Sequence, residues 1–180
     1  VVLAQTGKRV LLIDADMRKG HLNRLLGSER GLGLSEYIAG HASLAEVVKR
    51  LDPCDLDFVG TGTRPPNPSE LLMHDRLSEL LHWASETHDF VIVDAPPILA
   101  VTDAAVIARH AGAALMVVRA GAHPMGEIEE SVKRMRQSGA PVRGFVMNGL
   151  DTRPGYGYRY GYQYGYRYVY KYGADGSSKS

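Results

Sequence analysis

The stretch VLLIDADMR, residues 10–18, decides the fold of this 180-residue chain. Four apolar and mostly branched residues, 10–13, predict a strand that is buried on both faces, as the strands of parallel sheets are. Asp14 and Asp16 follow directly, and Arg18 comes after them. Because ligands of open α/β sheets bind beyond the carboxyl ends of the strands, the two acids suggest a site that positions a metal ion and a hydroxyl or water. The simpler interpretation is that both acids cap the next turn.

A second apolar run also ends in an acid. FVIV, residues 90–93, predicts another strand buried on both faces, and Asp94 follows it before two prolines that stop the strand. We expect further strands at 56–59, 113–118 and 142–147, and the longer helices at 69–87, 102–110 and 124–138. Strands that alternate with helices indicate an α/β fold, a parallel β-sheet with helices on both faces.

The composition predicts one folded domain and a tail. Hydrophobic residues make up 44% of the chain, which is enough for a core, and the composition changes after residue 150. We therefore expect a domain at 1–150 and a separate tail at 151–180. The formal net charge of +1 gives no reason to expect a nucleic-acid partner. The single cysteine, Cys54, excludes an intramolecular disulfide and any multi-cysteine metal site.

The first residues suggest that this sequence is part of a longer protein. It starts without Met, in what the sequence predicts to be the middle of a helix. No apolar run approaches the roughly 20 residues of a membrane span, and no signal peptide is recognisable. We expect these residues to form a soluble unit.

The loop GTGTRPPNPSE, residues 60–70, is not expected to bind phosphate. It lacks the Gly-Lys-Ser/Thr ending that brings an ammonium and a hydroxyl to the phosphates, and its three prolines have no N–H to donate. The glycines within 31–33 form a weaker pattern still. The printed sequence contains no P-loop.

The tail is dominated by tyrosines interleaved with glycine and arginine. Its nine tyrosines occupy every second position: Tyr156, Tyr158, Tyr160, Tyr162, Tyr164, Tyr166, Tyr168, Tyr170 and Tyr172. Because it has many glycines and no apolar partner face, we expect the tail to be of low complexity and mostly disordered. Considered by itself, it is also consistent with a solubilising or an aggregation-prone end.

Two buried strands that each end in Asp, on one parallel sheet, are the arrangement with which P-loop NTPases hold Mg²⁺. Together with the tail, four segments resemble the bacterial tyrosine kinases of capsule and exopolysaccharide export, of the Wzc type: TGKRVLLIDADMRKG at 6–20, GLSEYIAG at 33–40, RPPNPSELL at 64–72 and DFVIVDAPPILAVTDAA at 89–105. The resemblance implies a P-loop NTPase-like fold related to MinD and ParA, incomplete at its N-terminus, with ATP and Mg²⁺ as cofactors.

LLIDADMR is similar to the Walker A′ motif of that family, and FVIVD is similar to its Walker B motif. By this resemblance Asp94 holds magnesium, Asp14 orients the acceptor tyrosine hydroxyl, and Asp16 assists at the metal or its waters. Which of Asp14 and Asp16 acts as the base stays open. Asn148 corresponds to the residue that meets the adenine in related folds. Arg18 either contacts a phosphate or pairs with a carboxylate.

The resemblance implies a protein-tyrosine kinase that transfers the ATP γ-phosphate to tyrosines of its own tail and regulates capsule or exopolysaccharide polymerisation and export. It implies a homo-oligomeric ring in which the tail is phosphorylated in trans. It also implies a membrane-embedded polysaccharide co-polymerase segment, upstream or on a separate chain, at the cytoplasmic face of the bacterial inner membrane. Because the P-loop of this family precedes the position that matches Val1, we expect the printed residues alone to have little kinase activity.

Two other interpretations stay open. A partitioning ATPase of the MinD/ParA kind shares the fold and the strand-end acids, but nothing in such a machine requires nine tyrosines. A catalytically silent interaction module, whose partner supplies the phosphate site, would suit the missing P-loop.

Overall fold

The structure is a computed structural model that describes residues 1–52 and 55–150. Residues Val1–Asn148 form one compact unit. Cys54 and the nine tail tyrosines lie outside the described residues. The predicted domain boundary at residue 150 and the predicted disorder of the tail therefore stay predictions.

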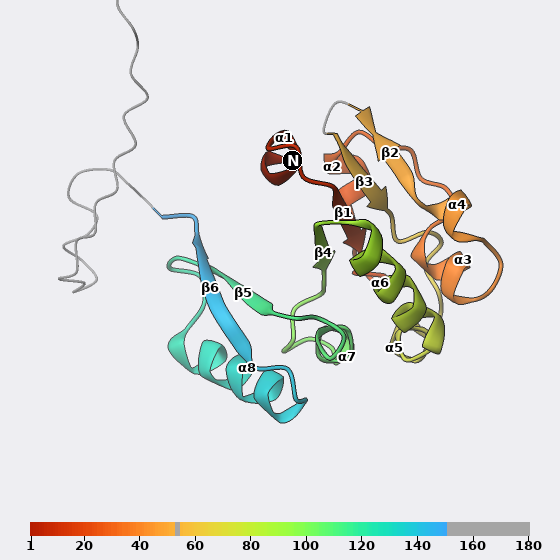
Figure 1. Cartoon of the computed structure of the whole chain (residues 1–180). Helices are drawn as coiled ribbons and strands as arrows, with labels where there is room; N and C mark the ends of the chain where they lie inside the picture. Colours follow the sequence, from red (N-terminus) through yellow and green to blue (C-terminus); the bar gives the residue numbers. More distant parts are fainter. Residues whose placement is uncertain (53–54, 151–180) are drawn as a thin grey trace, which may run out of the picture. The chain divides into compact units, whose positions relative to one another are not determined.

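The larger sheet of this unit has four strands in the order β2-β3-β1-β4 (Figure 1). Their bounds are Lys49–Leu51 for β2, Leu56–Val59 for β3, Val10–Asp14 for β1 and Phe90–Asp94 for β4. β1 lies in the centre and pairs in parallel with both β3 and β4. β2 pairs with β3 in the antiparallel direction, and this short edge strand was missed by the sequence analysis.

A second sheet contains two parallel strands, β5 (Ala114–Arg119) and β6 (Val142–Asn148). The α/β class and the parallel pairing of the long strands are thus confirmed. The expectation of a single sheet is wrong for the described residues, because β4 and β5 each have a hydrogen-bonded neighbour on one side only.

The helices of the described residues pack beside the two sheets, with α6 next to β4 and α8 next to β6 (Figure 1). They are α1 (Val2–Gln5), α2 (Leu22–Leu25), α3 (Leu34–Ile38), α4 (Leu44–Val47), α5 (Pro68–Leu72), α6 (Asp75–Thr87), α7 (Asp103–Ala108) and α8 (Met125–Gln137). None of these helices combines the length and the apolar character that crossing a bilayer requires.

The single helix predicted at 69–87 is wrong, because the structure divides it into α5 and α6. The chain becomes extended at His74, with ψ of 143°, which ends the first helix. His74 then caps the second helix, since its Nδ1 accepts a hydrogen bond from the backbone N–H of Arg76 at 3.2 Å. The apolar periodicity continues across this break and conceals it.

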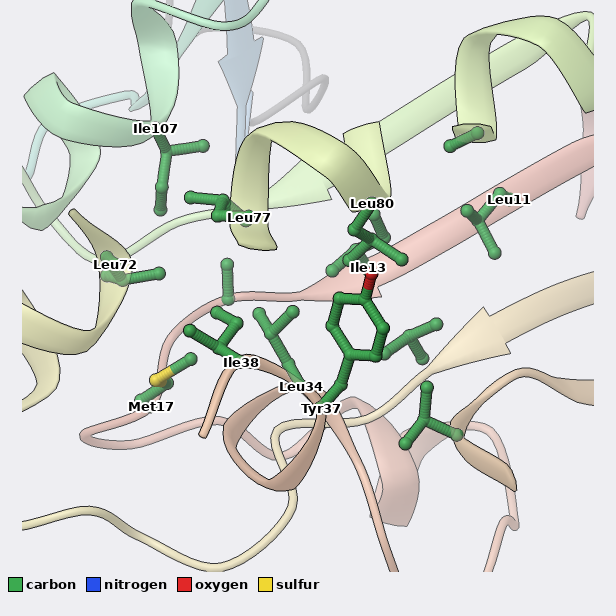
Figure 2. Packing of buried hydrophobic residues seen from close by; sticks show 14 of the residues in the cluster. Leu11, Ile13, Met17, Leu34, Tyr37, Ile38, Leu72, Leu77, Leu80 and Ile107 are labelled. Atoms are coloured by element: carbon green, nitrogen blue, oxygen red, sulfur yellow. The ribbon is translucent and has the colours of Figure 1, made fainter. Parts of the chain in front are cut away.

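β1 has helices on both of its faces, as predicted. Side chains alternate along a strand, so Leu11 and Ile13 point to one face while Val10 and Leu12 point to the other. The first pair packs in the main core with residues of α3, α5 and α6 (Figure 2). The second pair packs with residues of α1, α2 and β3. The predicted burial of β1 is therefore confirmed.

The prediction of burial on both faces is wrong for β4. Val91 and Val93 pack against the main core, but Phe90 and Ile92 on the opposite face are each 42% exposed. β5 is exposed in the same way, with Leu115 at 66%. A groove of about 940 Å³, lined by residues of β4, α7, β5, α8 and β6, lies along these uncovered side chains.

Glu36 fastens the loop after β3 to the first turn of α3. Its carboxylate accepts hydrogen bonds from the backbone N–H groups of Gly33 and Thr63, both at 2.9 Å, and from the Ser35 hydroxyl at 3.0 Å. Burial raises the pKa of Glu36, but the hydrogen bonds outweigh this effect and lower the pKa to about 2. Gly62 has a positive φ of 77°, and a Cβ there would collide with the Glu36 carboxylate, so this loop requires glycine.

We predict that Glu36→Gln lowers the free energy of unfolding by about 1–2 kcal/mol at pH 7, because amide-to-carboxylate hydrogen bonds are lost. Urea denaturation measures this loss. Since the pKa of Glu36 lies near its ordinary 4.5 when unfolded and near 2 when folded, the stabilisation is present above pH 4.5. It disappears as the pH falls toward 2, where the two proteins should converge.

Glu46→Gln is the matched control. Glu46 caps α4 with the same local pattern, accepting hydrogen bonds from the backbone N–H and the hydroxyl of Ser43, but it is exposed and joins no distant segment. We expect a smaller loss for this variant. Equal losses in the two variants would contradict the role of Glu36 in holding the loop.

Candidate active site

Asp14 and Asp94 are neighbours at the carboxyl edge of the larger sheet. β1 and β4 pair in parallel with Asp14 opposite Asp94, and the last residues of both strands are these two acids. The pairing continues one residue further, because the N–H of Ala15 donates to the carbonyl oxygen of Asp94 at 2.9 Å. Two acids that are 80 positions apart in the chain are thereby placed at one point of the sheet.

Asp14 is fully buried and organises the loop that follows β1. Its Oδ1 accepts a hydrogen bond from the N–H of Asp16 at 3.2 Å, and its Oδ2 accepts one from the N–H of Leu22 at 3.0 Å. Burial raises the pKa of Asp14, and the two backbone hydrogen bonds only partly oppose this rise. The carboxyl group is therefore fixed in orientation and costly to ionise.

Asp16 is half-buried and closes the next turn. Its Oδ1 accepts hydrogen bonds from the N–H groups of Arg18 at 3.1 Å and Lys19 at 2.9 Å. The interpretation that the two acids bind the backbone of the following turn is thus confirmed, and it is compatible with a second role. Oxygen lone pairs that face away from these amides remain for a ligand.

Asp94 is the acid whose carboxylate is available. Its side chain is exposed, and no group in the described part of the chain hydrogen-bonds to it. The protein atoms around Asp94 remove part of its hydration, which raises its pKa, and the nearby carboxylates of Asp14 and Asp16 raise the pKa further. An additional positive charge at this point would relieve both effects.

The donor set fits Mg²⁺. This ion prefers oxygen ligands, and in nucleotide sites it takes one or two carboxylates and completes its shell with phosphate oxygens and water. Within residues 1–52 and 55–150, no three metal-ligating side chains come together. An Mg²⁺ ion held by acids at this edge would take its remaining ligands from phosphate oxygens and water.

Gly20 is a site residue that the sequence analysis missed. Its N–H donates to the carbonyl oxygen of Asp16 at 2.6 Å. A Cβ at position 20 would lie 2.6 Å from both the Asp14 Oδ1 and that same carbonyl oxygen, so any larger residue would push the loop away from the acids. A glycine four residues after the second acid was the available signal.

Arg18 pairs with a buried carboxylate, which is one of its two predicted roles. Its Nε lies 2.9 Å from the Asp103 Oδ2, and its Nη2 donates to the Asp103 Oδ1 at 3.3 Å and to the Ser69 hydroxyl at 2.9 Å. The Ser69 hydroxyl in turn donates to Asp103 at 2.6 Å. The assignment of Arg18 to nucleotide binding stays a prediction.

Asn148 belongs to the other sheet. It is the last residue of β6, opposite Arg119 of β5, and its carbonyl oxygen accepts a hydrogen bond from the N–H of Ala120 at 2.9 Å. Its predicted contact with adenine stays a prediction. The tyrosines proposed as phosphorylation sites lie outside the described residues.

Comparison with curated proteins finds tyrosine kinases. No protein-family model matches the sequence. The chain is 47% identical over 161 residues to tyrosine-protein kinase wzc of Salmonella typhimurium, a match that covers 87% of the chain and 22% of that protein. It is 44% identical over 157 residues to tyrosine-protein kinase etk of Escherichia coli K12, covering 87% of the chain and 22% of the relative. The chain thus spans about a fifth of the length of the curated relatives it matches.

Solved structures agree with these relatives. The kinase domain of the Escherichia coli tyrosine kinase ETK has a TM-score of 0.84 and 43% identity, covering 93% of this chain and 64% of that one. The VpsO kinase domain has a TM-score of 0.78 and 30% identity, covering 83% of this chain and 74% of that one. MinD of Pyrococcus horikoshii, at 20% identity and a TM-score of 0.65, covers 81% of this chain and 59% of that one and shares the fold alone. The predicted relation to the MinD fold is confirmed.

We predict that Asp94→Asn raises the midpoint of thermal unfolding at pH 7 by about 1–2 °C, a small gain because solvent screens this exposed group. The ionised carboxylate is disfavoured in the folded protein, so removing its charge stabilises the fold. The gain should shrink as the pH falls below the raised pKa of Asp94 and vanish below the ordinary value of 3.8, where the carboxyl of the unaltered protein is protonated in both the folded and the unfolded state. Scanning calorimetry across this pH range measures it.

Asp89→Asn is the matched control at the opposite end of β4. Hydrogen bonds from the side chain and backbone of Arg9 lower the pKa of Asp89, so its charge is favoured by folding. This variant should lower the unfolding midpoint at pH 7. A destabilised Asp94→Asn would show that the carboxylate is satisfied within the protein and has no need of a cation.

Proposed function

The chain belongs to the family of bacterial tyrosine kinases, and on this premise we propose that the protein transfers the γ-phosphate of ATP to tyrosine hydroxyls, including those at 156–172 in its own chain. The observation that carries the proposal is the pair of acids, Asp14 and Asp94, in register at the carboxyl edge of the sheet. Oxygen ligands at that edge suit an ion bound to phosphates. The proposal also rests on the nine tyrosines that follow the domain.

The acids would act by position more than by basicity. A tyrosine hydroxyl has a pKa near 10 and an ordinary Asp has one near 4, so full deprotonation of tyrosine by Asp is unfavourable. Burial raises the pKa of Asp14 and narrows this gap. Phosphoryl transfer passes through a loose transition state in which alignment and charge neutralisation dominate. A buried Asp14, held by two backbone amides, is suited to orient the acceptor hydroxyl.

Asp94 would hold Mg²⁺, because it is the acid at this edge with a carboxylate free of protein hydrogen bonds in the described residues. Asp16, half-buried beside it, would assist at the metal or its waters. When bound, the ion neutralises charge on the β- and γ-phosphates. Asp14 would thereby be left to position the acceptor, and either Asp14 or Asp16 could receive its proton.

We expect most of the phosphate affinity to come from a segment outside the printed residues, which contain no P-loop. The edge of β4 that borders the groove has no strand partner within the described ranges. An extended segment added in parallel at such an edge would be held by backbone hydrogen bonds and would end beside Asp94. The printed residues alone should bind ATP weakly.

We further propose that the kinase is a homo-oligomer whose tail is phosphorylated in trans. Residues 151–180 carry five basic and two acidic side chains, a formal charge of +3. An unmodified tail would be attracted to the acids of a neighbouring subunit, whereas each phosphate adds about −1.5 to −2 and a few would reverse the sign. By analogy with Wzc-type relatives, the partner is a membrane-embedded polysaccharide co-polymerase segment and the process is capsule or exopolysaccharide export at the inner membrane.

We predict that the full protein, incubated with Mg²⁺ and ATP, acquires phosphotyrosine within 156–172, and that Asp14→Asn slows this at least about 100-fold because the acceptor loses its orienting carboxylate. Mass spectrometry of tail peptides measures both. Asp89→Asn, a loss of the same charge at the other end of the sheet, should leave the rate unchanged. ATP hydrolysis with an unmodified tail would instead support a MinD/ParA-type ATPase, and no ATP binding would support a silent module.

Replacing all nine tail tyrosines with Phe should keep the full protein oligomeric in the presence of ATP. The reason is that a tail without acceptors keeps its positive charge and stays attracted to the neighbouring site. Light scattering before and after addition of Mg²⁺ and ATP measures the mass of the assembly. Dissociation of this variant on ATP addition would refute the link between phosphorylation and assembly.

A further inference from the structure

Arg18, Ser69 and Asp103 form a polar cluster that joins three separate segments. Arg18 lies in the loop after β1, Ser69 in the first turn of α5, and Asp103 at the beginning of α7. Asp103 is 0% exposed, and it accepts both a bidentate pair of hydrogen bonds from Arg18 and one from Ser69. Eighty-five positions separate Arg18 from Asp103.

A carboxylate buried this completely needs a charged partner. Losing one member of a buried ion pair leaves the other charge without compensation, which is strongly destabilising. Burial acts to raise the pKa of Asp103, but the hydrogen bonds from Arg18 and Ser69 outweigh it and the pKa is lowered. The Asp103 carboxylate is therefore ionised at neutral pH, and it fixes the position of the Arg18 guanidinium.

The backbone N–H of Arg18 also helps to orient an acid of the candidate active site. The N–H of Arg18 donates to the Asp16 carboxylate at 3.1 Å, and the next N–H, of Lys19, donates to the same oxygen at 2.9 Å. The loop then returns to Asp14 through the N–H of Leu22 at 3.0 Å. Every amide that orients these two acids lies within four residues of Arg18.

We propose that Asp103 is a positioning residue of the active site, which fixes the loop at 15–22 through Arg18 and so sets the orientation of Asp16 and Asp14. Ser69 supports it by closing the hydrogen-bonded triangle. This inference rests on the proposed kinase function for its catalytic consequence, but its structural part does not. Both carboxylate oxygens of Asp103 are bound by side chains of the cluster, so Asp103 acts on the reaction through the arginine.

The test compares Asp103→Asn with the unaltered full protein. The variant keeps the shape of the side chain and loses the charge that holds Arg18. We expect kcat for tail phosphorylation to fall about 10–100-fold, because small displacements of a catalytic group have effects of this size. KM for ATP should stay within about twofold, since phosphate affinity comes from elsewhere. Amide exchange in a peptide covering 15–22 should be about tenfold faster.

Asp57→Asn is the matched control. Asp57 also joins separate segments: its Oδ2 lies 3.0 Å from the Nε2 of His88 at the end of α6, and its Oδ1 accepts a hydrogen bond from Arg50 of β2 at 3.3 Å. These contacts tie β3 to α6 and β2 and do not involve the loop at 15–22. Its loss should lower stability without changing kcat or exchange in 15–22. Ser69→Ala and Arg18→Lys, which remove part of the cluster, should give intermediate effects and serve if Asp103→Asn does not fold.

The outcomes separate the two proposals. A variant with lower stability, unchanged kcat and unchanged exchange in 15–22 would make the cluster purely structural and overturn the inference. If the unaltered protein makes no phosphotyrosine, the kinase proposal fails, while amide exchange still decides whether Asp103 holds the loop. If kcat and KM for ATP change together in Arg18→Lys but not in Asp103→Asn, Arg18 acts on the nucleotide and the positioning role is refuted.

Discussion

The register of β1 against β4 is the constraint on which the rest of the structure depends. Because side chains alternate along a strand, a slip of one residue would turn Leu11 and Ile13 away from the main core and separate Asp14 from Asp94. One alignment of the two strands therefore determines both the packing that stabilises the domain and the placement of its acids. The core between β1 and α6 carries most of the large buried side chains, and it holds this alignment in place.

The acids and the arginine cluster differ in their electrostatic balance. At the edge of the sheet, removal from water raises the pKa values of Asp14 and Asp94, and repulsion from neighbouring carboxylates, that of Asp16 above all for Asp14, raises them further, so their charges oppose folding. Asp103 of α7, by contrast, has the Arg18 guanidinium and the Ser69 hydroxyl as partners, and its charge is favoured. Unfavourable charges retained beside well-paired ones are typical of sites whose compensation comes with a ligand.

Features that depend on the local sequence could be predicted, and features that depend on partners distant in the chain could not. Four apolar residues followed by Asp identify both β1 and β4 with their terminal acids, because burial and strand end are local signals. The pairing of Arg18 with Asp103 leaves no such signal, since 85 positions separate them. Likewise, the break at His74 depends on one extended backbone angle within a continuous apolar pattern. For β4, the apolar run signals a strand but not which of its faces is covered, since Val91 and Val93 pack in the core while Phe90 and Ile92 are exposed.

The uncovered strands at the groove have a consequence for handling the protein. β4 and β5 each present a row of backbone donors and acceptors beside exposed apolar side chains such as Ile92 and Leu115, with no proline within either strand. Such edges are templates on which copies of a chain can stack into growing ribbons. The printed residues alone should therefore self-associate at high concentration, and a lysine in place of Ile92 would oppose this self-association.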